Sequence, residues 1–175
     1  MDIISEVFDH NQADYIETLI KSPVCEWAYL HDSSGTIHSG RTFPSFSKPI
    51  YHESKGSLDH QLFHRLEMAS VLIAAKAQCK YNELARIRLG MHLPDPSWDG
   101  HHGVHVDQQS PHTVVIYYVN DSDGDTYLFD SDRQTVIHKV SPKKNTMLVF
   151  DGNIPHASSY PSFGQRLVIN YNFNR

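Results

Sequence analysis

Residues 113–150, TVVIYYVNDSDGDTYLFDSDRQTVIHKVSPKKNTMLVF, decide the fold that we expect for this chain. Four segments rich in β-branched and aromatic residues alternate there with clusters of Asn, Asp, Ser, Gly and Pro. Such segments are typical of short strands, and the clusters are typical of the turns between them. No segment in between has the length or pattern of a helix, so parallel strands joined by crossover helices are not expected.

The same pattern extends from residue 84 to residue 175. The predicted strands are Leu84–Leu89, Gly103–Asp107, Thr113–Val119, Thr126–Asp130, Thr135–Val140, Thr146–Phe150, Pro155–Ser159 and Arg166–Phe173. A double-sheet jelly roll or a small barrel limits the exposed edges of so many short strands. The predicted class is therefore mainly β (α+β), with helices from the first third of the chain packed on the outside.

The first third predicts two helices. The first is capped by Asp9 or Asn11 and runs to about Lys21. The second is capped by Ser57 and runs from Leu58 to about Lys80. Its buried stripe consists of Leu62, Leu66, Ala69, Ile73 and Ala77, which recur at spacings of three and four.

The remaining N-terminal segments predict a strand at residues 27–30, a turn at 33–35 and a surface loop at 39–57, which is rich in Ser, Pro and Gly. A chain of 175 residues fits a single domain. Within it we expect residues 1–83 to form a helical support region with loops, and residues 84–175 to form the jelly-roll core.

Composition narrows the classes of function. The net charge of −5 argues against a dedicated nucleic-acid binder, whereas 13 histidines favour metal chemistry. Cys25 and Cys79 do not form a disulfide framework, and no apolar run has the length of a membrane span. Asp2 and Glu6 stand where a signal peptide would be positively charged. We therefore expect a cytoplasmic protein that does not enter a membrane.

The segment His101–Asp107, HHGVHVD, is the richest in metal-ligand side chains. On a strand, alternate side chains share a face, so His105 and Asp107 would point the same way. A third ligand from a facing strand would complete a 2-His-1-carboxylate triad, which suits non-haem Fe(II) and leaves coordination positions open. His156, just past a predicted strand and turn, is the candidate for that ligand.

Arg166 opens the last predicted strand, on its half-polar face with Val168, Asn170 and Asn172. An arginine on the inner face of a barrel needs an anionic partner, because an unpaired buried charge is costly. Its planar guanidinium suits bidentate binding of a carboxylate. The 2-His-1-carboxylate set and the inward-facing arginine together predict iron and a dicarboxylate co-substrate.

At these residues the sequence resembles the Fe(II)/2-oxoglutarate-dependent dioxygenase superfamily, specifically its prolyl-hydroxylase-like branch. The matching segments are HVD at 105–107, VIYYVN at 115–120, DGDTYLF at 123–129 and PKKNTMLVF at 142–150, followed by His156 and Arg166. Order and spacing agree over about residues 84–175. Short stand-alone members occur in bacterial viruses (phages), and this chain has their length; a viral protein would work in the host cytoplasm.

The resemblance implies a double-stranded β-helix (jelly roll, cupin-like) with the metal site at its mouth. His105, Asp107 and His156 carry over as iron ligands and, with Arg166, as the catalytic residues. Arg166 would bind the distal carboxylate of 2-oxoglutarate. Tyr118 would donate a hydrogen bond to the same carboxylate, and Thr126 would line that pocket.

One family contact is not matched. Relatives often place a further tyrosine one strand before the HxD motif, where this chain reads Arg86-Ile87-Arg88-Leu89. Arg88 is the candidate replacement at that end of the pocket. Residues 91–102 would overhang the site as a lid, and residues 39–57 would form a second wall.

The implied activity is hydroxylation of an sp3 carbon of a peptidyl or free amino acid such as proline. Fe(II) would be the cofactor, 2-oxoglutarate and O2 the co-substrates, and succinate and CO2 the by-products. Relatives that halogenate lack the carboxylate ligand, so Asp107 favours hydroxylation. The oligomeric state does not follow from the sequence.

Two other functions remain open from the sequence. A nucleic-acid dealkylase on the same scaffold typically has a second arginine six residues after the first, where this chain has Asn172. The other function is a non-catalytic, cupin-like metal-binding domain. The presence of His105, Asp107, His156 and Arg166 argues against it, because a degenerate site needs none of them. The other histidines at 92, 101, 102, 112 and 138 are expected to be exposed loop residues, and Asp121–Asp125 to form an acidic turn.

Overall fold

The computed structural model describes residues 1–32, 42–97 and 99–175. The strands are β1 (Asp2–Ser5), β2 (Ala28–Leu30), β3 (Ser45–His52), β4 (Gly56–Ser57), β5 (Leu84–His92), β6 (His112–Tyr118), β7 (Thr126–Phe129), β8 (Val136–Val140), β9 (Thr146–Asp151), β10 (His156–Ser158) and β11 (Arg166–Asn174). The helices are α1 (His10–Lys21) and α2 (His60–Lys76), with a 3-10 turn, η1, at Tyr81–Glu83. No helix in these residues is long and apolar enough to cross a membrane.

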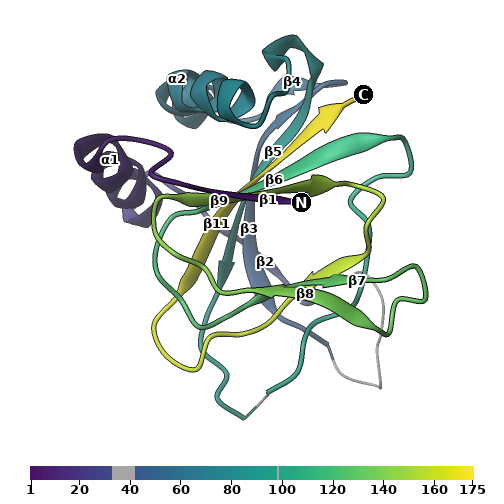
Figure 1. Cartoon of the computed structure of the whole chain (residues 1–175). Helices are drawn as coiled ribbons and strands as arrows, with labels where there is room; N and C mark the ends of the chain where they lie inside the picture. The colour runs from purple at the N-terminus through teal and green to yellow at the C-terminus, as the bar shows by residue number, and fades with distance from the viewer. Residues whose placement is uncertain (33–41, 98) are drawn as a thin grey trace.

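The strands form two antiparallel sheets, which confirms the predicted jelly-roll class. The larger sheet has the order β1-β9-β6-β11-β5-β3-β2, with β4 paired to β3, and the smaller sheet has the order β10-β7-β8. Figure 1 shows β7 and β8 on one side of the larger sheet and both helices on the other.

The alternation along β11 builds a different core on each face of the larger sheet. Leu167, Ile169, Tyr171 and Phe173 face the helices and pack with the buried stripe of α2. Val168 faces the smaller sheet and packs with Leu128, Leu148 and Phe150. The polar members of that inner face, beginning with Arg166, are therefore enclosed between the sheets.

The two predicted helices are present, with one corrected cap. The Asp9 carboxylate accepts a hydrogen bond from the Gln12 backbone N–H at the start of α1, as expected for an N-cap. At the start of α2 the cap is Asp59, which accepts from the Leu62 N–H, whereas the predicted cap Ser57 belongs to β4. Asp59 stands directly before the first helical residue, so its carboxylate reaches the free N–H groups.

The predicted surface loop at 39–57 is wrong for residues 45–52, which form β3 beside β5. Ser45 and Ser47 are buried where the pattern predicted exposure. Pro49 obscured the strand, and it stands at a register shift where a missing N–H is tolerated. Residues 39–41 of that loop and the turn predicted at 33–35 lie outside the described residues.

Two further strand predictions change. β1, which the sequence did not predict, pairs with β9 at the sheet edge. The predicted strand 103–107 is reduced to a single bridge between His105 and His156. The division of the chain at residues 83 and 84 stays a prediction. The larger sheet is continuous across it, because β1 pairs with β9 and β3 pairs with β5.

Candidate active site

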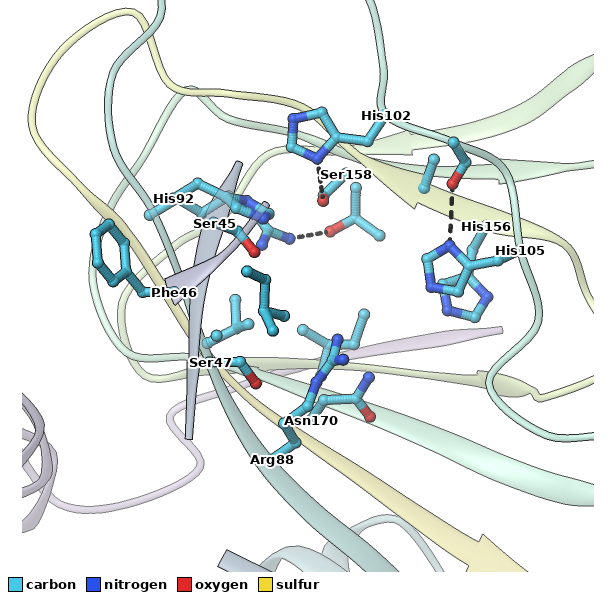
Figure 2. A pocket seen from close by; sticks show the side chains of 18 residues that line it. Ser45, Phe46, Ser47, Arg88, His92, His102, His105, His156, Ser158 and Asn170 are labelled. Carbon is cyan, nitrogen blue, oxygen red and sulfur yellow. Dashed lines mark hydrogen bonds between the residues drawn. The ribbon is translucent and has the colours of Figure 1, made fainter. Parts of the chain in front are cut away.

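A pocket opens between the two sheets and contains most of the predicted site residues (Figure 2). His105, His156, Thr126 and Arg166 line it, and β3 contributes Ser45, Phe46 and Ser47. The expectation that residues 39–57 supply a second wall is therefore met by β3. From the predicted lid, His92 and His102 line the pocket, and Trp98 lies outside the described residues.

The structure brings His105, Asp107 and His156 together. Their ligand atoms all lie within 4.8 Å of one another. The two histidines are fixed side by side by a pair of backbone hydrogen bonds, from His105 N to His156 O (3.0 Å) and from His156 N to His105 O (2.9 Å). Asp107 Oδ1 lies 4.0 Å from His105 Nε2, and Asp107 Oδ2 lies 3.9 Å from His156 Nε2.

Backbone contacts select the tautomer of both histidines. His105 Nδ1 lies 3.0 Å from the Gly103 carbonyl, and His156 Nδ1 lies 3.1 Å from the Ile154 carbonyl. A carbonyl only accepts, so each Nδ1 carries the proton and each Nε2 offers a lone pair toward Asp107. His156 Nε2 is buried and has no hydrogen-bond partner in the described residues. Burial, only partly opposed by Asp107, lowers the pKa of His156 to about 4, so the ring is neutral near pH 7.

Three side chains that sequence reasoning missed hold Asp107. Arg86 Nη2 lies 2.7 Å from Oδ1, and the side-chain amides of Asn170 and Asn172 each donate to Oδ2 at 3.0 Å. Burial opposes ionisation of Asp107, but Arg86, the two histidines and Asn172 outweigh it and hold its pKa well below the usual range. The polar alternation of residues 166–172 was the available signal for the two asparagines.

Arg166 is 3% exposed and has neutral partners. Its Nε donates to the Gly124 carbonyl (2.8 Å), and its Nη2 donates to Thr126 Oγ1 (2.9 Å). The Tyr118 hydroxyl also donates to Thr126 Oγ1 (2.9 Å). Tyr118 is fully buried behind Thr126 and does not line the pocket. Arg166 and Thr126 therefore present the polar groups at this end, and Tyr118 supports Thr126.

The expectation of exposed loop histidines is wrong for three of five. His92, His102 and His112 are buried, whereas His101 is partly buried and His138 is exposed as expected. Burial, reinforced by the nearby Arg166, lowers the pKa of His102 to about 3. The Phe43 and Tyr160 rings pack against His102 at centroid distances of 4.9 and 4.3 Å. These contacts link residues distant in sequence, so no local pattern signalled them.

Residues 93–174 match a family model described as the 2OG-Fe(II) oxygenase superfamily. None of the curated protein sequences compared with the chain matches it. Among solved structures, an oxidoreductase of the 2OG-Fe(II) oxygenase family from Burkholderia pseudomallei superposes with a TM-score of 0.68 at 14% identity, over 96% of this chain and 81% of that one.

Two prolyl hydroxylases are also similar in structure. The prolyl-4-hydroxylase of Pseudomonas putida has a TM-score of 0.59 at 14% identity, covering 99% of this chain and 91% of that one. A prolyl hydroxylase from Trichoplax adhaerens, in complex with a peptide fragment of hypoxia inducible factor, has a TM-score of 0.63 at 15% identity, covering 98% and 83%. At these identities the structural likeness shows the shared fold alone. The segment that the family model matches, residues 93–174, contains the whole His–Asp–His group and Arg166.

Proposed function

We propose that this chain is an oxygenase of the 2OG-Fe(II) type and hydroxylates an sp3 carbon of a peptidyl or free amino acid such as proline, a proposal that its family match and fold support. The observation that carries the proposal is the presence of two chemical groups in one pocket. One is the cluster of His105, Asp107 and His156. The other is Arg166, which is buried and has no carboxylate partner in the described residues.

The cluster fits a divalent metal. Two Nε2 lone pairs and one carboxylate are the donor set of a 2-His-1-carboxylate site, and a cation would satisfy the buried His156 Nε2. His105, Asp107 and His156 would therefore hold Fe(II). Bound with 2-oxoglutarate and O2, Fe(II) supplies the oxidative chemistry that couples release of succinate and CO2 to cleavage of a C–H bond.

The protein's own residues bind and orient the reactants. Arg166 binds the distal carboxylate of 2-oxoglutarate with the guanidinium N–H groups that Gly124 and Thr126 leave free. Thr126 lies at the same carboxylate, and the Tyr118 hydroxyl fixes its position. Arg86, Asn170 and Asn172 keep the Asp107 carboxylate ionised and oriented toward the histidines.

The choice of proline as substrate has indirect support. The Trichoplax adhaerens neighbour is a prolyl hydroxylase in complex with a peptide, and this chain shares its fold. Asp107 supports hydroxylation over halogenation, because halogenating relatives lack that carboxylate. The cytoplasmic location and the lid formed by residues 91–102 stay predictions.

An anaerobic titration of metal-free protein with Fe(II), and then with 2-oxoglutarate, tests the proposal. We expect a weak visible charge-transfer band only when both are present. The band should be lost in His105→Ala and unchanged in His138→Ala, which removes an exposed histidine. In Arg166→Ala, loss of a charge-assisted contact worth about 1.5–3 kcal/mol should weaken 2-oxoglutarate binding roughly 10- to 100-fold. A folded wild-type protein without the band would contradict the proposal.

A further inference from the structure

A second arginine, Arg88, lines the same pocket and has no task in the proposed function. It lies on β5 opposite Asn170 of β11, four residues along that strand from Arg166. With a rise of about 3.3 Å per residue, the two arginines enter the pocket about 13 Å apart along the sheet. Figure 2 shows the Arg88 side chain extending into the pocket on the side of Ser47 and Asn170.

Among the described residues, the Arg88 side chain has no ion pair of its own, although the charge of Asp107 acts on it. In the described residues it has no carboxylate partner and no hydrogen bond, and its Nε is buried. Asp107, the carboxylate that acts on Arg88, already contacts Arg86, Asn170 and Asn172. Arginine remains protonated in proteins, and Arg88 is only partly exposed, so leaving its charge without a counter-ion has a cost. An anion supplied from outside the chain would remove that cost.

The co-substrate of the proposed function does not supply this anion. One carboxylate of 2-oxoglutarate is assigned to Arg166, and the other end of the molecule would lie at the metal held by His105, Asp107 and His156. With Fe(II) and the co-substrate bound, the positive charges of the metal, Arg86, Arg88 and Arg166 would outnumber the negative charges of Asp107 and the two carboxylates. Asp125, whose charge also acts on Arg166, is paired with Lys139. A further anion is therefore favoured near Arg88.

We propose that Arg88 binds the carboxylate of the organic substrate, so that the enzyme acts on a free amino acid and not on a residue inside a peptide chain. This inference rests on the proposed function and narrows its substrate class. Ser45 and Ser47, on the β3 wall of the pocket, offer hydroxyl donors for the same ligand. A residue within a peptide would bring a neutral carbonyl to this position and leave Arg88 unpaired.

The test uses the full chain loaded anaerobically with Fe(II) and 2-oxoglutarate. Thermal shifts are measured with each of the proteinogenic L-amino acids and with the matching amino-acid amides, L-proline and L-prolinamide included. The variants are Arg88→Met, which keeps the length without the charge, Arg88→Lys, which keeps the charge, and Arg65→Met on the exposed surface of α2. The affinity for 2-oxoglutarate is measured in every variant from the charge-transfer band.

We expect at least one amino acid to raise the Tm of wild type while its amide does not. Arg88→Met should abolish this shift, Arg88→Lys should retain part of it, and Arg65→Met should match wild type. Affinity for 2-oxoglutarate in Arg88→Met should stay within about threefold of wild type, since the co-substrate contacts other groups.

Three results would overturn the inference: no amino acid exceeding its amide in wild type, a shift that survives in Arg88→Met, or a fall of roughly tenfold or more in 2-oxoglutarate affinity in that variant. The last result would assign Arg88 to the co-substrate. A missing charge-transfer band in wild type would contradict the oxygenase function itself. If the charge-transfer band forms but the thermal shifts do not distinguish amino acids from their amides, only the proposed substrate class would be overturned.

Discussion

Both oxygens of the Asp107 carboxylate have partners within the protein itself. Arg86 contacts Oδ1, and two asparagine amides from β11 contact Oδ2. Donors of this kind orient a ligating carboxylate, and their loss typically reduces metal affinity by about 10- to 100-fold. Because these donors lie on β5 and β11, the fold itself orients the Asp107 carboxylate.

Asn172→Ala tests this orientation. The side chain is fully buried, and its Nδ2 donates to Asp107 Oδ2. We expect Fe(II) affinity, measured by anaerobic titration, to fall roughly tenfold or more. The matched control is Asn174→Ala, two residues along the same strand, where the side-chain amide donates to Glu53 and accepts from Gln108 but does not contact Asp107. That control should stay within about twofold. Equal losses in the two variants would mean that Asn172 does not position the ligand.

His102 predicts a dependence of stability on pH. Burial lowers its pKa to about 3, below the ordinary value of 6.5, so the unfolded chain binds this proton more readily between those values. The contribution of neutral His102 is complete above pH 6.5 and is lost as the pH falls from there toward 3. We expect wild type to lose up to about 1.4 kcal/mol more unfolding free energy per pH unit than His102→Gln over this range.

Urea denaturation at pH 7, 6, 5 and 4 measures this difference. His138→Gln is the control, because His138 is exposed and its replacement should leave the slope of wild type unchanged. Parallel curves for wild type and His102→Gln would show that His102 is not held neutral by the fold.

At the level of elements, the connection from β9 to β10 sets the position of His156. It turns at Gly152, whose N–H donates to the His112 carbonyl at 2.8 Å. The His112 ring packs directly on this glycine, and a Cβ there would lie 2.1 Å from His112 Nε2. β10 begins four residues later at His156. The absence of a side chain at residue 152 therefore lets β6 and this turn approach closely.

Gly152→Ala should disturb both stability and the site. Overpacking against a buried ring costs typically about 1–3 kcal/mol, and we expect a loss of unfolding free energy in that range or above it. Because the turn must move, Fe(II) affinity should fall as well. The neighbouring Asn153→Ala is the control, since the contact of Asn153 is made by its backbone N–H. Unchanged stability in Gly152→Ala would contradict the close approach.

Across the whole molecule, the N-terminal half covers the outer face of the larger sheet. Ile16, Ile20, Leu62 and Leu66 pack in one cluster with residues of β5, β6, β9 and β11. β3 also occupies the edge of β5, and β1 occupies the edge of β9. Without residues 1–83, that apolar face and both edges would be open to water.

A fragment of residues 84–175 tests whether this half can fold alone. We expect it to show no cooperative thermal transition and to bind the dye ANS, because burial of the apolar face is the main driving force that it lacks. The full chain is the control and should unfold cooperatively. A cooperative transition in the fragment would instead establish residues 84–175 as an independent core.

The sequence by itself determined both helices, most strands of the C-terminal half, the jelly-roll class and the residues of the His–Asp–His group, but not β1 or β3. Alternation, caps and turn residues act over a few positions, so they can be read locally. The tertiary structure alone decided that Arg86, Asn170 and Asn172 hold Asp107, and that Arg88 lines the pocket with no ion-pair partner in the described part of the chain. These residues are far from Asp107 along the chain, and only the register of β5 against β11 brings them together. The pattern along a strand shows which side chains share a face, but not which residues of a strand distant in the sequence lie opposite them.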